Sequence, residues 1–146
     1  MEEFTISGRD SCLTIRLVEV YGFPDNTSHW GGYDTRAAIH VKVGGFSVDS
    51  TLWTSTGELF ELYQQFRICN ESVKGTVRFE SYEHQLNFTA HYTPAGQILI
   101  EGVFSEFSDS NNELTFHMHT DQSYIQSTLA EMQKIVQKYG GMEGVT

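Results

Sequence analysis

Several histidines have a spacing that could place imidazole rings on one face of a β-sheet. His117 and His119 are two residues apart in a segment that alternates apolar and polar side chains, so both point to the same side. With His91 or His84 from another strand, they could form an imidazole metal site. The alternative is that they occupy a solvated face. No cysteine or acidic residue joins them at a fixed ligand spacing, so we expect no metal and no cofactor.

Carboxylates are the second group with possible chemistry. Two of them could hydrolyse a glycoside if they lay across a cleft at the required separation. In an acidic chain, however, a solubilising surface is the simpler interpretation. The candidates are Glu80, Glu83, Glu101, Glu106, Asp109 and Glu113.

A nucleophile is harder to find. Cys12 and Cys69 stand in no signature motif, and the sequence contains no G-x-S-x-G elbow, no phosphate-binding glycine loop and no H-E-x-x-H. Two distant cysteines without a secretion signal are typical of reduced, buried thiols. We therefore expect no catalytic residue, and a protein that is not an enzyme.

A long aromatic segment, residues 21–34, interrupts the regular pattern. Exposed aromatic side chains are favoured anchors at protein interfaces, and long loops are uncommon unless they are functional. Two alternatives remain open: the rings could cover the open end of the sheet, or they could line a small-molecule pocket. Trp53, on the polar side of its strand, has a similar ambiguity. The candidate partner-binding residues are Phe23, Asp25, Trp30, Tyr33 and Asp34.

Charge and length limit the possible partners. The chain has 146 residues, 19 acidic against 9 basic, and a net charge of -10. This charge opposes binding to nucleic acids and to anionic membranes, which both require lysine and arginine. The length predicts a single domain, residues 1–146. The acidic start, residues 1–6, is unlike a secretion signal and predicts a cytoplasmic protein.

The elements that must position these residues are mostly strands. Apolar side chains alternate with polar ones in several segments, beginning with Leu13, Ile15 and Leu17, and Gly44-Gly45 predicts a hairpin turn. Helical spacing and capping residues, including a capping box formed by Ser55 and Glu58, predict helices near 55–68 and 121–139. A strand that includes Val73 is expected after the first helix. We expect an α+β fold: a curled antiparallel sheet of about seven or eight strands, sandwich or partial barrel, with two helices.

Two short segments are distinctive, Phe23-Pro24-Asp25 and Asp121-Gln122-Ser123. The positions that accompany them along the chain are Tyr21, Tyr33-Asp34, Ile39 to Val43, Leu52-Trp53-Thr54, Glu58-Leu59, Leu62, Glu83, Leu86 and Leu129. In the order of these residues, the chain resembles the WapI-type immunity proteins and related small bacterial proteins over residues 12–139.

This resemblance implies a cytosolic, non-enzymatic protein that neutralises a cognate bacterial toxin by direct binding. It implies no catalytic residues. Asp25, Asp34 and the segment from Glu80 to Glu83 are candidate charges for steering a basic toxin. The alternative function is a small-ligand-binding domain or an enzyme that uses the polar face of the sheet, with His91, His117 and His119.

Overall fold

The computed structural model describes residues 2–106 and 112–144. Within these ranges the chain forms four strands, a helix, four further strands and a second helix. The first four strands are β1 (Glu3–Gly8), β2 (Ser11–Val20), β3 (Asp34–Val43) and β4 (Phe46–Ser55). The last four are β5 (Gly75–Glu80), β6 (Leu86–Tyr92), β7 (Gln97–Ser105) and β8 (Glu113–Asp121). The helices are α1 (Thr56–Ser72) and α2 (Gln122–Tyr139).

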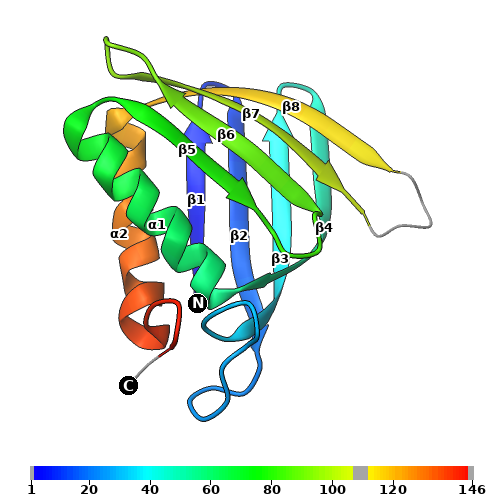
Figure 1. The fold of residues 1–146 in the computed structure, drawn as a ribbon. Coiled ribbons are helices and arrows are strands. Elements are labelled where there is room, and N and C mark those ends of the chain that lie inside the picture. Colours follow the sequence, from blue (N-terminus) through cyan, green and yellow to red (C-terminus); the bar gives the residue numbers. More distant parts are fainter. Residues whose placement is uncertain (1, 107–111, 145–146) are drawn as a thin grey trace.

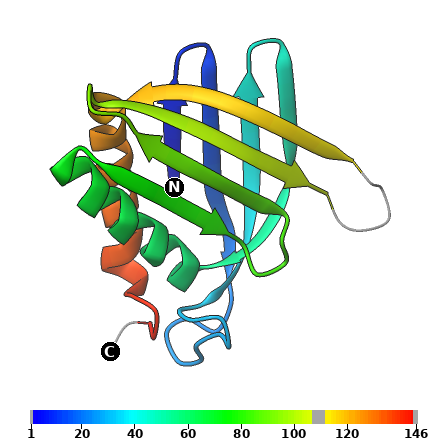
Figure 2. The ribbon, with the colours of Figure 1, turned by 45° about the horizontal axis from the view of Figure 1, so that its top comes forward.

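The described strands form two antiparallel sheets, β1-β2-β3-β4 and β5-β6-β7-β8, which do not join into a closed barrel. The second sheet crosses over the first (Figure 1 and Figure 2). Where β8 passes the β1–β2 turn, the Arg9 N–H donates to the His119 carbonyl at 3.0 Å. The helices lie side by side, α2 against β1 and α1 against β5, and cover one side of the space between the sheets. The predicted α+β class is confirmed.

The core lies between the two sheets and the helices, and the strand periodicity accounts for it. Leu13, Ile15 and Leu17 of β2 are buried, and so are alternate residues of β3, β6 and β7. Polar side chains between them face outward, as expected for sheets with one solvated face. The Gly44-Gly45 turn joins β3 to β4 as predicted, with Val43 opposite Phe46.

Helix α1 begins as the sequence predicts but continues further, to Ser72 instead of residue 68. Ser55 and Glu58 form a capping box, each accepting a backbone N–H of the other residue. The helix continues because Asn70 is buried and its amide oxygen accepts the Tyr92 hydroxyl at 2.8 Å. Val73, expected in the next strand, instead caps the helix with φ of 53°.

Helix α2 buries a stripe slightly different from the one its apolar residues indicate. Leu129 and Val136 are half-buried, whereas Thr128 and Ile135 are buried. The Thr128 hydroxyl donates to the Thr5 carbonyl of β1 at 2.7 Å, which satisfies this polar group inside the interface. Among the described residues, no helix has the length and apolar character needed to cross a membrane.

The first testable prediction concerns packing between the strands of the second sheet. Gly102 of β7 lies between Phe88 and Phe116, and an added Cβ would stand 2.5 Å from the Phe116 ring. We expect Gly102→Ala to lower the free energy of unfolding by about 1–3 kcal/mol, because the rings must shift. Gly45→Ala is the control, since its Cβ would meet no atom within 4 Å. Equal stability of both variants in chemical denaturation would contradict this packing.

Candidate functional site

The long segment before β3 is fixed against the start of α1. The Tyr33 N–H donates to the Thr56 hydroxyl at 2.7 Å, and the Thr56 N–H donates to the Tyr33 carbonyl at 2.9 Å. The backbones approach so closely that a Cβ at Gly57 would lie 2.5 Å from the Gly31 carbonyl. Glycine at the start of the helix, unfavourable by propensity, is therefore required by this contact.

Two of the five candidate partner-binding residues belong to an aromatic cluster that covers the end of the core. Tyr33 is 0% exposed, so its ring belongs to the core in this structure, and its part in partner binding stays a prediction. Its ring packs edge-on against Phe23 at 5.1 Å, and Phe23 packs against Tyr139 of α2 at 4.9 Å. Phe23 retains 37% exposure. Tyr33 fills the core because its backbone is bonded to the start of α1.

Trp30 lies instead on the surface and Asp34 is half-buried, and both contact a residue that is distant in sequence. The Trp30 indole is 49% exposed and stacks on Tyr82, with ring centroids 5.1 Å apart and planes 6° from parallel. The Tyr82 hydroxyl donates to the Asp34 carboxylate at 2.6 Å. Tyr82 follows β5 in the turn to β6, so this contact joins the two sheets at one end.

A second aromatic pair lies near Asp34. Tyr21 stacks on Trp53, with centroids 6.1 Å apart, and the Tyr21 N–H donates to the Asp34 carbonyl at 2.8 Å. Trp53 is on β4, two residues before Ser55, the register partner of Asp34, and is therefore a diagonal neighbour of Asp34 on the outer face. We call Tyr21, Trp30, Asp34, Trp53 and Tyr82 the acid–aromatic patch.

Glu58 lies beside this patch, half-buried at the start of α1. Its carboxylate accepts the Thr54 hydroxyl at 2.8 Å and the Ser55 N–H at 3.2 Å. Loss of hydration and the nearby Asp34 charge nevertheless raise its pKa from 4.5 to about 7. Burial and the Asp34, Glu83 and Glu58 carboxylates also raise the pKa of the Tyr82 phenol. The patch therefore has a negative electrostatic field.

Sequence reasoning found part of this patch and missed the rest. Asp25 is exposed as expected, and its N–H donates to the Gly22 carbonyl at 2.8 Å. Asp25 is not among the residues that form the patch. Tyr82 was missed because it lies 48 residues from Asp34 and no local pattern marks it. Glu58 was recognised only as a capping residue.

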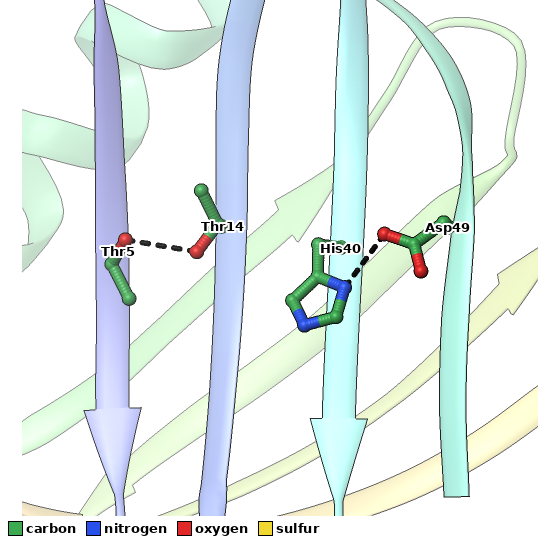
Figure 3. Close-up of polar contacts among 4 residues, drawn as sticks. All are labelled: Thr5, Thr14, His40 and Asp49. Carbon is green, nitrogen blue, oxygen red and sulfur yellow. Dashed lines mark hydrogen bonds and ion pairs between the residues drawn. The ribbon is translucent and has the colours of Figure 1, made fainter.

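The outer face of the first sheet carries polar pairs on neighbouring strands (Figure 3). Thr5 and Thr14 share a hydrogen bond of 2.8 Å, and His40 contacts the Asp49 carboxylate at 2.7 Å. Thr14, His40 and Asp49 border an open hollow of about 480 Å³. The side chains of His40 and Asp49 are both exposed, so water screens the charges of this pair.

The outer face of the second sheet holds the histidines considered as metal ligands. The His91 ring contacts the Thr76 hydroxyl at 3.0 Å, and the His117 ring lies 3.9 Å from Glu101. Leu99 stands between His91 and His119 in the strand register. In the described ranges, no three His, Cys, Asp or Glu side chains form a group suited to a metal ion. An open hollow of about 620 Å³ includes His117.

Three of the candidate carboxylates, those of Glu80, Glu101 and Glu106, have separate partners. Glu80 lies 3.4 Å from His84, and Glu106 accepts the Ser50 hydroxyl at 3.0 Å. Asp109 lies outside the described residues. Cys12 and Cys69 are free within the described part of the chain, as expected, and burial raises the pKa of Cys69.

The second testable prediction follows from the raised pKa of Glu58. The Glu58 carboxyl has its ordinary pKa of 4.5 in the unfolded state and a pKa of about 7 in the folded state. As pH rises between these two values, the unfolded state loses the proton while the folded state keeps it, so the free energy of unfolding falls. Glu58→Gln keeps the capping box and removes the charge. The free energy of unfolding of Glu58→Gln minus that of wild type, measured by urea denaturation, should increase by about 2 kcal/mol from about pH 5 to pH 8.

The control for this experiment is Glu61→Gln, which removes an exposed carboxylate from the same helix. We expect its stability difference from wild type to change less over this pH range than that of Glu58→Gln. Parallel curves for Glu58→Gln and wild type would show that the Glu58 carboxyl is not destabilised by burial.

Comparison with known proteins places this chain in a family. No curated protein and no solved structure matches it. The model of the immunity protein WapI-like family matches residues 4–140, which include both sheets, both helices and the acid–aromatic patch. This match covers nearly the whole chain, and it confirms the resemblance found in the sequence. The protein belongs to the WapI-like immunity protein family.

Proposed function

We propose that this protein is a cytoplasmic immunity protein that neutralises a cognate bacterial toxin by binding it directly, without catalysis. The observation that carries the proposal is the family match over residues 4–140. Two features support it. A net charge of -10 favours rapid association with a basic toxin domain, and the exposed Trp30 ring provides a candidate anchor.

Co-expression tests this function. The toxin domain encoded by the neighbouring gene should arrest growth of a bacterial host when expressed alone, and co-expression of this protein should restore growth. The two purified proteins should elute together in size-exclusion chromatography. Growth arrest that persists at full expression of this protein, with no complex formed, would contradict the proposal.

The third testable prediction separates an anchor from a core residue. Trp30→Ala should raise the dissociation rate from that toxin domain in surface plasmon resonance, at a cost of about 2 kcal/mol or more. The change in melting temperature should be small, because the indole is 49% exposed. Phe46→Ala is the matched control, because Phe46 is also exposed, at 71%, and is the first residue of β4. The acid–aromatic patch lies at the other end of this strand, near Trp53.

Neutralising steering charges should have a different effect. Asp25→Asn should lower the association rate and its salt dependence, with little effect on dissociation.

If Trp30→Ala instead lowers the melting temperature sharply and leaves binding unchanged, the indole only covers the core and the toxin binds elsewhere.

The hollow on the second sheet favours a second candidate function, the binding of a small polar ligand. Its charged lining includes Arg78, Glu101 and His117, which suits a ligand that carries both charges. A thermal-shift screen of small zwitterionic metabolites tests it. A stabilising compound whose effect disappears in Glu101→Gln would support this candidate, and a screen without such a compound would remove it.

A further inference from the structure

We propose that the acid–aromatic patch binds an arginine side chain of the protein partner, with the guanidinium on the Trp30–Tyr82 stack and hydrogen-bonded to Asp34. The identity of that partner as a toxin rests on the proposed function. The chemistry of the contact rests on three observations: an exposed indole in a rigid stack, a carboxylate beside it, and the charges around both.

The rings form a surface suited to a planar cation. Trp30 and Tyr82 are 6° from parallel, and the tyrosine hydroxyl is held by Asp34, so the stack has a fixed orientation. Trp30 remains 49% exposed even with His29 packed against it at 81°. Tryptophan is the side chain whose ring face attracts cations most strongly.

The charges near the stack are complementary to a cation. Three carboxylates, those of Asp34, Glu83 and Glu58, act on the Tyr82 phenol. The Arg36 guanidinium hydrogen-bonds the Tyr21 side chain of the patch, and it lies 3.4 Å from the Glu19 carboxylate, which offsets its charge. A cation from a partner would therefore enter a region of net negative charge.

Arginine fits this geometry better than lysine. A guanidinium is planar, so it can lie on the indole and still direct an N–H group sideways to a carboxylate. A carboxylate has about four lone-pair positions, and the Tyr82 hydroxyl uses one on Asp34. An ammonium group has no flat face for the same double contact.

The first experiment measures this chemistry without a toxin. The peptide acetyl-Gly-Arg-Gly-amide is titrated into the ¹⁵N-labelled full chain, with a citrulline peptide of the same shape and no charge as the control. The Trp30 indole N–H signal, assigned with Trp30→Phe, should shift saturably at millimolar arginine peptide and not with citrulline. An unmoved Trp30 signal would overturn the proposal.

Matched variants then test the role of the carboxylate. Asp34→Asn removes one charge and keeps an oxygen that can accept the Tyr82 hydroxyl, and it should weaken peptide binding by about tenfold. Asp49→Asn removes the same charge from the His40 pair on the outer face of the first sheet (Figure 3) and should not weaken it. Equal effects of the two variants would mean general charge attraction and overturn the proposal.

The toxin experiment separates the two proposals. If wild type binds the toxin domain and Asp34→Asn weakens that binding more than Asp49→Asn, both proposals are supported. If the toxin binds and Asp34→Asn has no specific effect, the arginine contact is wrong and the immunity function stands. If the toxin does not bind but the arginine peptide shifts Trp30, the immunity function is wrong and the arginine chemistry stands.

Discussion

The close backbone contact between residues 31–33 and the first turn of α1 is the constraint on which the candidate site depends. Gly57 allows the approach, and the two hydrogen bonds between Tyr33 and Thr56 fix it. The same contact fixes Tyr33 in the core and leaves Trp30 on the surface. A long segment that could have been mobile is thereby a rigid support for an exposed ring.

The start of α1 also links helix capping to electrostatics. Glu58 completes the capping box with Ser55, and the same half-buried carboxylate contributes to the negative field around Tyr82. A capping residue at the surface would keep an ordinary acid pKa because water solvates its charge. Burial by the neighbouring segments raises the pKa of Glu58 to about 7. One residue therefore stabilises the helix and shapes the potential of the candidate binding surface.

The parts of the fold that were predictable are those set by local pattern. Alternation in β2 and the Gly44-Gly45 turn predicted the strands and the hairpin, and the Ser55–Glu58 box predicted the start of α1. Features fixed by distant partners were not predictable. The continuation of α1 depends on the contact of Asn70 with Tyr92. The division of the eight described strands into two sheets depends on pairing between whole strands, which no local pattern encodes. For the same reason, the sequence indicated an aromatic surface segment but not Tyr82.

The hydrogen-bond partner of Asp34 distinguishes this carboxylate from others on the outer faces of the sheets. On those faces, carboxylates lie beside groups that can carry a positive charge: Asp49 beside His40, and Glu101 beside His117. Asp34 instead accepts a hydrogen bond from a phenol, which stabilises the carboxylate without cancelling its charge. Glu58 also takes its hydrogen bonds from a hydroxyl and a backbone N–H, but burial raises its pKa to about 7, so it carries its full charge only above neutral pH. A negative charge held in this way, beside exposed rings, is best compensated by a cation that arrives with a partner.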